Sequence, residues 1–295
     1  MLKTKIIIRN FFIFLGLSLS LLSVFLFFSL EPKKLTIYFF DVGQGDAILI
    51  RTPNHFNILI DGGPDKIVLY KLGKYLPFYD RCLDLVVLTH ADADHLIGLV
   101  EVLDRYQIKN ILLTEAYNNS PPYRELLELI KRYNIPVLLA GEIKTIGIEN
   151  NLDLNILYPF SSVAGKDSKI ENEASIILRL DYNHFSALFT GDAPSSVENS
   201  LIKQNTNLVA SVLKIAHHGS KASSASSFLR AVNPKLAIIP VGQNRFGHPN
   251  PEVLARLEQL NIKFLDTKNK GDIIISSRGQ NFWLNQSPIN YLSIN

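Results

Sequence analysis

The 295-residue chain is poor in cysteine, with Cys82 as its single thiol. One thiol cannot form an intrachain disulfide, and a zinc site built from several cysteines is excluded. Any metal ion must therefore be held by histidine, aspartate or glutamate. We interpret Cys82 itself as a small buried apolar residue.

The chain also lacks a strong excess of charge, internal repeats and low-complexity segments. Its formal net charge is +3, which does not indicate a general nucleic-acid binder. Hydrophobic residues make up 47% of the chain, enough for a large buried core. We divide the chain into an N-terminal segment, residues 1–32, and one globular domain, residues 33–295.

The N-terminal segment contains a long uncharged stretch, Asn10–Leu30. About 20 apolar residues suffice to cross a bilayer, so we predict a transmembrane anchor. Three basic residues precede the stretch and favour a cytoplasmic N-terminus, but Lys33 and Lys34 follow it and weaken that argument. A cleaved signal peptide is the alternative, and in both cases the rest of the chain lies outside the cytoplasm.

After residue 32, short apolar strands alternate with amphipathic helices. This order predicts two sheets with outer helices, an α/β sandwich. The polar residues of interest fall where strands end, and loops there can present them. The expected helices are Leu96–Tyr106, Tyr123–Tyr133, Ala193–Gln204, Ser224–Val232 and Pro251–Leu260, and the expected strands are Leu35–Asp41, Ala47–Arg51, Phe56–Ile60, Leu83–Thr89, Ile111–Thr114, Val137–Leu139, Asn155–Tyr158, Ile176–Asp181, Ser186–Thr190, Ser211–Ala216, Leu236–Val241, Phe264–Leu265, Asp272–Ser276 and Phe282–Leu284.

Four possible metal ligands lie within six residues: His90, Asp92, Asp94 and His95. Residues two apart on an extended segment point the same way, so the first three side chains can converge. Nitrogen and oxygen donors of this kind suit divalent ions such as Zn²⁺ and Mn²⁺. A solvated acidic loop is the alternative, but four potential ligands packed around two alanines after an apolar strand favour a metal site.

Three later segments also place polar residues after apolar strands. Asp192 could bridge two metal ions through its two carboxylate oxygens. His217 and His218 form a pair at a strand end, and His248 lies in a Gly/Pro turn. Taken alone, each of these residues could equally be an ordinary turn residue.

Two N-terminal segments could support such a site. Asp61, before two glycines, could hold a ligand imidazole in the right tautomer. Asp41 and Asp46 flank Gly43-Gln44-Gly45, whose glycines allow a close backbone approach, as in any tight turn. Three basic residues near the motifs could neutralise a substrate phosphate or simply be solvated: Lys214, Lys221 and Arg245.

Taken in order, these motifs resemble the metallo-β-lactamase superfamily and, more narrowly, the C-terminal hydrolase domain of the competence protein ComEC. The resemblance runs from about Leu35 to Leu284. The segments that carry it are Asp41-Val42-Gly43-Gln44-Gly45-Asp46-Ala47, Leu59-Ile60-Asp61-Gly62-Gly63, Leu88-Thr89-His90-Ala91-Asp92-Ala93-Asp94-His95-Leu96-Ile97-Gly98, Asn172-Glu173-Ala174-Ser175, Phe189-Thr190-Gly191-Asp192, Leu213-Lys214-Ile215-Ala216-His217-His218-Gly219-Ser220, Asn244-Arg245-Phe246-Gly247-His248-Pro249 and Gly271-Asp272-Ile273.

The chain departs from the superfamily motif H-x-H-x-D-H at its second histidine position, which holds Asp92. The superfamily's separate third-motif histidine has no evident counterpart either, because Asn172 and Ser175 occupy that stretch. Both departures are also found in the ComEC-like branch and argue against a β-lactamase. A carboxylate in place of an imidazole shifts the metal preference from Zn²⁺ toward Mn²⁺ or Mg²⁺ without deciding it.

The resemblance implies a four-layer αβ/βα sandwich that binds two divalent metal ions, Mn²⁺ or Zn²⁺. His90 and Asp92 would serve one metal, and Asp94 and His95 the other. Asp192 would bridge the two ions. Asp94 and Asp192 are the expected catalytic residues. The remaining implied ligands are His217, His218 or both, with His248 a ligand or phosphate contact, and the residues expected to support ligands or touch substrate are Asp41, Gln44, Asp46, Asp61, Asn172, Ser175 and Ser220.

The implied reaction is phosphodiester hydrolysis, with a metal-bound water attacking phosphorus. ComEC domains of this kind accompany a DNA-uptake channel. The channel helices are absent here, so we expect a nuclease at the outer face of the cytoplasmic membrane, with DNA as substrate and a separate channel protein as a candidate partner.

Two alternatives stay open. One is a surface phosphodiesterase that acts on cell-wall or lipid-headgroup phosphoesters. The other is a non-catalytic tethered accessory protein, against which the full ligand set argues.

Overall fold

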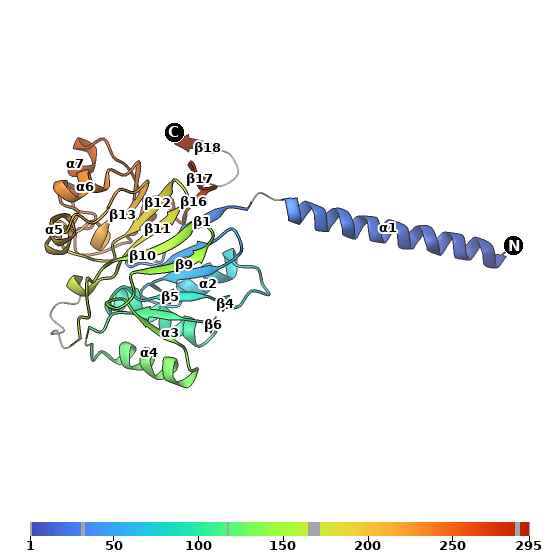
Figure 1. Ribbon diagram of the computed structural model, residues 1–295, viewed down its shortest axis with the longest axis horizontal. Coiled ribbons are helices and arrows are strands. Elements are labelled where there is room, and N and C mark those ends of the chain that lie inside the picture. The colour runs from blue at the N-terminus through green and yellow to red at the C-terminus, as the bar shows by residue number, and fades with distance from the viewer. Residues whose placement is uncertain (1, 31–32, 117, 165–171, 287–289, 295) are drawn as a thin grey trace. The chain divides into compact units, whose positions relative to one another are not determined.

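The computed structural model describes residues 2–30, 33–116, 118–164, 172–286 and 290–294. The chain forms two compact units, residues 1–33 and 34–295. The first unit is helix α1 (Leu2–Leu30), drawn in blue in Figure 1. Within the described ranges, no helix combines the length and the apolar character needed to cross a membrane. This finding gives the predicted single-pass anchor no support.

The second unit stacks two sheets face to face, and the predicted α/β sandwich is confirmed (Figure 1). In the described part of the chain, one sheet has nine strands, the other has seven, and β4 (Cys82–Leu83) pairs with β6 (Gln107–Ile108) outside both. The strand order of the first sheet is β18 (Asn290–Ile294), β17 (Phe282–Gln286), β16 (Ile273–Ser277), β1 (Leu35–Phe39), β2 (Ile48–Arg51), β3 (Asn57–Ile60), β5 (Leu85–Val87), β7 (Ile111–Leu113) and β8 (Val137–Leu139). The strand order of the second sheet is β15 (Lys263–Asp266), β14 (Leu236–Ile239), β13 (Val212–Lys214), β12 (Phe185–Phe189), β11 (Ile177–Tyr182), β10 (Leu152–Tyr158) and β9 (Thr145–Glu149).

Helices cover the outer faces of the two sheets (Figure 1). Each amphipathic helix buries one apolar stripe, because removing that surface from water stabilises the layer. The helices are α2 (Ile67–Tyr75), α3 (Ala93–Leu103) and α4 (Pro121–Arg132) on the first sheet, α5 (Ser195–Lys203), α6 (Ser226–Val232) and α7 (Pro251–Gln259) on the second, the short α8 (Thr267–Lys270), and the 3-10 turns Asn172–Ala174 and Ala216–Gly219.

The central core lies between the two sheets. Ile37 and Ile58 from the first sheet and Leu154 and Ala187 from the second are fully buried in one cluster. Strands buried on both faces need continuous apolar runs, which explains why these segments are rich in Ile, Leu and Val.

Parallel strands decide where the site lies. In the first sheet, β3, β5, β7 and β8 are parallel neighbours, and in the second, β12 to β15 are. The carboxyl ends of parallel strands gather at one edge of a sheet, and the loops there hold functional groups. The chain reaches His90 after β5, Asp192 after β12 and His218 after β13.

Helix α3 begins three residues earlier than predicted. Asp92 is the last extended residue, with φ −69° and ψ 147°, and occupies the N-cap position of a helix that begins at Ala93. Asp94 therefore lies in the first turn, and the prediction that extended spacing aligns it with His90 is wrong. Asp94 projects from the helix instead.

Other differences lie outside the site. The predicted strand Leu83–Thr89 is divided at Asp84, whose carboxylate accepts the Asn57 N–H at 2.8 Å and Lys109 Nζ at 2.6 Å. Cys82 is half-buried, not buried. Helix α2 was not predicted, because nine residues are marginal as an isolated helix and this one is stabilised by tertiary contacts of Val68 and Leu72.

Candidate metal centre

Asp61, at the end of β3, organises one side of the site. Its Oδ1 accepts the backbone N–H of Thr89 at 2.8 Å, and its Oδ2 accepts the Thr89 hydroxyl at 2.7 Å. The same Oδ2 lies 2.8 Å from Nδ1 of His95. Carboxylate oxygens only accept, so the hydrogen in this contact belongs to His95 Nδ1, and in the neutral imidazole Nε2 carries the lone pair.

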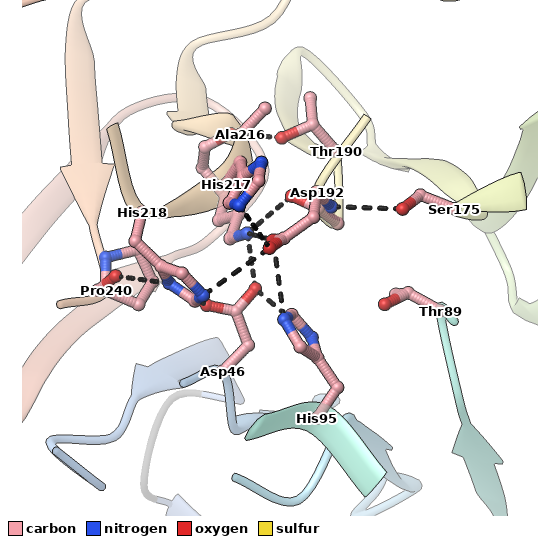
Figure 2. A network of polar contacts seen from close by, with 12 residues as sticks. Asp46, Thr89, His95, Ser175, Thr190, Asp192, Ala216, His217, His218 and Pro240 are labelled. Atoms are coloured by element: carbon pink, nitrogen blue, oxygen red, sulfur yellow. Dashed lines mark hydrogen bonds and ion pairs between the residues drawn. The ribbon is translucent and has the colours of Figure 1, made fainter. Parts of the chain in front are cut away.

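Two more histidines are fixed in the same tautomer. The Thr89 hydroxyl donates its only hydrogen to Asp61, so its oxygen accepts from His90 Nδ1, 3.0 Å away. Nδ1 of His218 lies 2.8 Å from the carbonyl oxygen of Pro240, which also only accepts (Figure 2). Each imidazole therefore donates outward through Nδ1, and in its neutral form Nε2 is the acceptor.

The three Nε2 atoms face carboxylates. His90 Nε2 lies 3.4 Å from Asp92 Oδ2. His95 Nε2 lies 3.4 Å from Asp192 Oδ1. His218 Nε2 lies 3.2 Å from Asp94 Oδ2 and 3.5 Å from Asp192 Oδ2.

Asp192 lies where the two sheets contribute to one centre. Its side chain is 3% exposed, and its backbone N–H donates to Ser175 Oγ at 3.2 Å. Figure 2 shows His95, His217 and His218 arranged around its carboxylate. Burial alone would raise the pKa of Asp192, but the charges of His218, His95 and Lys214 lower it well below the usual range.

Strained backbone positions one pair of ligand candidates. His217 (φ 51°, ψ 46°) and His218 (φ 52°, ψ 25°) are both left-handed, a conformation that costs a non-glycine residue about 1–3 kcal/mol. Asp61 also has a positive φ, 58°. Such strain is typical of residues held in place for function. It brings His218 into the centre and leaves His217 at its margin.

The sequence left the choice between His217 and His218 open, and the structure distinguishes their positions. The side chain of His218 is 1% exposed and reaches two carboxylates. The side chain of His217 is 29% exposed, with Nε2 3.8 Å from Asp192 Oδ2. His217 Nδ1 also lies 3.4 Å from Asn172 Nδ2.

His248 lies farther out. Its ring centre is 5.4 Å from that of His217, and burial together with the charges of His217 and His218 lowers its pKa. His248 is not a member of any three-residue group of metal-ligand atoms found among the described residues.

Lys214 is buried, so neither role considered for it, contact with a substrate phosphate or a solvated side chain, is found. Its side chain is 1% exposed and forms an ion pair with Asp46. Nζ also donates to the Gly191 carbonyl at 2.6 Å and lies 3.5 Å from Asp192 Oδ1. Burial alone would lower the pKa of Lys214, but the carboxylates of Asp46 and Asp192 raise it. Lys214 is therefore a buried cation next to the ligand candidates.

The other predicted residues are distributed around the site. Gln44 Oε1 accepts the Gly242 N–H at 3.3 Å and joins two loops. Asp41 Oδ1 accepts the Gly43 N–H at 3.3 Å, within its own turn. Ser220 Oγ accepts the Ala222 N–H at 3.4 Å, again a local contact. Lys221 and Arg245 are exposed.

Sequence reasoning missed three contributors: the Thr89 hydroxyl, the Pro240 carbonyl and the buried position of Lys214. Thr89 directly precedes His90, and this position in the sequence was a signal. The role of its hydroxyl, however, depends on Asp61, which comes from another part of the chain. The carbonyl of Pro240 carries no sequence signal, because every residue has one.

The donor set fits a pair of divalent cations. Nε2 of His90 and Nε2 of His95 are buried without a hydrogen-bond partner in the described part of the chain. Lone pairs that face carboxylate oxygens repel unless a cation or proton lies between them. Two groups offer ligand atoms within 4.8 Å of one another: His90, His95 and Asp192, and Asp94, His95 and His218.

A third group, Asp46, Asp61 and His95, already has protein partners for His95 Nδ1 and for one oxygen of Asp46. Its His95 nitrogen Nδ1 is bonded to Asp61, and its Asp46 carboxylate is paired with Lys214. These residues therefore support the centre from behind. Asp46 also acts on His218: burial alone would lower the pKa of His218, but Asp192, Asp46 and Asp94 raise it to about 10.

Comparison with known families identifies the chain. A model of the metallo-beta-lactamase superfamily matches residues 40–243, and the chain belongs to this superfamily. It is a metal-dependent hydrolase of the metallo-beta-lactamase fold, related to competence proteins.

Three curated relatives cover most of the chain. ComE operon protein 3 of Bacillus subtilis is 30% identical over 254 residues, 79% of this chain and 32% of that protein. Competence protein ComA of Neisseria gonorrhoeae is 29% identical over 82% of this chain and 32% of that protein. Recombination protein 2 of Haemophilus influenzae is 27% identical over 88% of this chain and 31% of that protein. The chain spans about a third of the length of these relatives.

Solved structures share the fold. The metallo-beta-lactamase fold protein YhfI from Bacillus subtilis superposes with a TM-score of 0.55 at 13% identity, covering 82% of this chain and 100% of that chain. Igni18, a metallo hydrolase from Ignicoccus hospitalis, gives a TM-score of 0.53 at 15% identity, covering 82% of this chain and 98% of that chain. At such identities the likeness concerns the fold alone.

Proposed function

We propose that this chain is a two-metal phosphodiesterase that cleaves nucleic acid. The observation that carries the proposal is the convergence of three imidazoles, His90, His95 and His218, each with Nδ1 donated outward and Nε2 turned toward carboxylates. Such outer hydrogen bonds orient metal-binding histidines and strengthen them as ligands.

His90 and Asp92 are proposed to hold one ion, Asp94, His95 and His218 the other, and Asp192 both. Mixed imidazole and carboxylate donors suit Mn²⁺ or Zn²⁺. Bound divalent ions would lower the pKa of water and offset negative charge on phosphoryl oxygens.

The protein's own groups divide the remaining work. The Asp94 side chain is 33% exposed, whereas that of Asp192 is 3% exposed, so Asp94 faces the side from which substrate arrives. Burial alone would raise the pKa of Asp94, but its hydrogen bond with His218 and the charge of His95 lower it. Asp94 is therefore ionised at neutral pH and can accept a hydrogen bond from the attacking water and orient it.

Charge and relationship support a nucleic-acid substrate. Lys221 and Arg245, exposed on loops next to His218 and His248 in the sequence, can contact backbone phosphates. The relatives include Competence protein ComA and Recombination protein 2. We propose DNA outside the cytoplasmic membrane as the substrate.

The location rests on the uncharged stretch Asn10–Leu30, which we propose as a single-pass anchor. We also propose a separate channel protein as a partner of this chain.

The test is metal content and cleavage by the purified full chain. We expect about two Mn²⁺ or Zn²⁺ ions per chain by elemental analysis. We also expect cleavage of single-stranded DNA and of bis-p-nitrophenyl phosphate, both lost in the Asp94→Ala/Asp192→Ala variant. Glu258→Ala, an exposed carboxylate on α7, is the matched control and should behave as wild type.

Two results would count against the proposal. Absence of stoichiometric metal together with full activity of the double variant would overturn the metal centre. Cleavage of bis-p-nitrophenyl phosphate without cleavage of any nucleic acid would leave the chemistry and favour cell-wall or lipid-headgroup phosphoesters as substrate.

A further inference from the structure

Phe246 is a large apolar side chain left in solvent beside the metal centre. Phe246 is 73% exposed and lies in the loop between β14 and α7. Exposing a phenylalanine leaves apolar surface in water, so a residue that serves only packing would be buried. A single exposed apolar residue is ordinary on its own, but the surroundings of this one are built.

The loop that carries Phe246 is held by Asn244. Its Oδ1 accepts the N–H groups of Phe246 at 3.1 Å and His248 at 3.0 Å. Its Nδ2 donates to the carbonyls of Gly242 at 2.9 Å and His248 at 2.8 Å. These four hydrogen bonds of one side chain close the loop and hold the backbone that carries the Phe246 ring.

A row of rings connects Phe246 to the centre. The Phe246 ring centre is 5.8 Å from that of His248, with 31° between the planes. The His248 ring is 5.4 Å from that of His217, whose Nε2 lies 3.8 Å from Asp192 Oδ2. Phe246 therefore stands at the outer end of this row of rings.

We propose that Phe246 is a stacking platform for an unpaired nucleobase of a single strand whose phosphodiester lies at the metal centre. This inference rests on the proposed function and names how the substrate is recognised. Aromatic faces hold bases of any sequence, because every base has a π-face. Arg245, which is exposed and directly precedes Phe246 in the sequence, adds positive charge for the strand's phosphates.

The stacking platform distinguishes single-stranded from double-stranded substrate. A base inside a duplex is stacked on its neighbours and cannot offer its face to a side chain, whereas an unpaired base can. Phe246 thus favours single-stranded substrate without reading its sequence.

The experiment measures KM and kcat of the metal-loaded full chain on a 12-residue oligothymidylate. We expect Phe246→Ala to raise KM about 5- to 150-fold, the range of losses when a stacked base loses its aromatic partner. Phe246→Trp should keep the wild-type KM, and Phe246→Leu should not, because stacking needs a flat π-system. Phe78→Ala, at a position 87% exposed on the loop after α2, is the matched control and should change nothing.

A strand without bases completes the test. On an abasic strand of the same length, wild type and Phe246→Ala should have equal KM values. Quenching of 2-aminopurine fluorescence by wild type but not by Phe246→Ala gives a direct signature of stacking.

Equal KM of wild type and Phe246→Ala on oligothymidylate, or a full rescue by leucine, would overturn the platform while DNA cleavage still supports the proposed function. If the chain cleaves bis-p-nitrophenyl phosphate but no nucleic acid, both proposals fall together.

Discussion

Oδ2 of Asp61 lies 2.8 Å from Nδ1 of His95, and this contact decides which nitrogen of the imidazole faces the centre. The same oxygen accepts the Thr89 hydroxyl at 2.7 Å, and Thr89 in turn accepts from His90. One carboxylate directly after β3 thereby orients two histidines, one preceding α3 and one within it.

Replacing this carboxylate should weaken metal binding. In Asp61→Asn, one amide oxygen remains for three donors, and the amide NH₂ opposes at least one of them. We expect a 10- to 100-fold lower affinity for Mn²⁺ or Zn²⁺, the usual effect of losing such a partner, measured by calorimetric titration. Asp65→Asn, an exposed carboxylate on the same loop, is the control. Wild-type affinity in Asp61→Asn would show that Asp61 does not orient the ligands.

Removing Lys214 should destabilise the metal-free protein. Burial alone would raise the pKa of Asp46, but Lys214, His95 and His218 lower it to about 2, so this carboxylate is a buried anion. Lys214→Met takes away its cation, and breaking a buried pair costs about 3–5 kcal/mol. Urea unfolding in the presence of chelator measures the change.

The double variant Asp46→Asn/Lys214→Met provides the control for that prediction. It removes both charges, so it should recover a large part of the lost stability. Equal stability of the single and double variants would mean that Lys214 acts through its contact with the Gly191 carbonyl and not through Asp46.

A methyl group at Gly98 should disrupt the packing of α3 on the Asp61 loop. Its Cβ would lie 1.9 Å from the Gly62 carbonyl oxygen and 2.7 Å from that of Asp65, and backbone must move to admit it. We expect Gly98→Ala to lower the free energy of unfolding by about 3 kcal/mol or more and to weaken metal binding. Gly73→Ala in α2, where no atom lies within 4 Å, should leave stability unchanged or raise it by up to about 1 kcal/mol.

Glu198 should make the protein less stable as pH rises toward neutrality. Burial raises its pKa to about 7, although the Ser224 and Ala225 N–H groups and the charge of Arg256 oppose that shift. Between pH 4.5 and 7 the unfolded chain has lost this proton and the folded chain keeps it. The contribution is therefore complete below pH 4.5 and is lost as pH rises through 7, by about 3 kcal/mol in total.

Urea unfolding from pH 5 to pH 8 tests this prediction. Glu198→Gln cannot titrate, so its stability should fall less over this range than that of wild type. Glu252→Gln, whose carboxylate is 66% exposed and faces the same Arg256, should keep the wild-type profile. Parallel profiles for wild type and Glu198→Gln would contradict the raised pKa.

Much of the architecture was predictable because residues close together in the sequence determine it. Apolar runs ended by turn residues marked most strands of both sheets, and the predicted strand Val137–Leu139 coincides with β8. The start of α3 was misplaced because the apolar periodicity begins at Leu96, whereas the helix begins at Ala93. Helix α2 was not predicted because its stability comes from contacts with residues distant in the sequence, such as the ion pair of Lys71 with Asp272 at 2.6 Å.

The sequence alone determined which kinds of donor atom the site contains. With one cysteine, only imidazoles and carboxylates were at hand, and the run from His90 to His95 placed four of them together. The ordered motifs also indicated the metallo-beta-lactamase superfamily, which the family match confirms.

Only the tertiary structure decided how those donors are used. The choice of Nε2 over Nδ1 depends on Asp61, Thr89 and the Pro240 carbonyl, and the inward position of His218 depends on left-handed backbone at two residues. It also placed Lys214 behind the carboxylates and Phe246 in solvent. Hydrogen-bond partners distant in the chain, and the burial that strengthens them, exist only once the two sheets have packed.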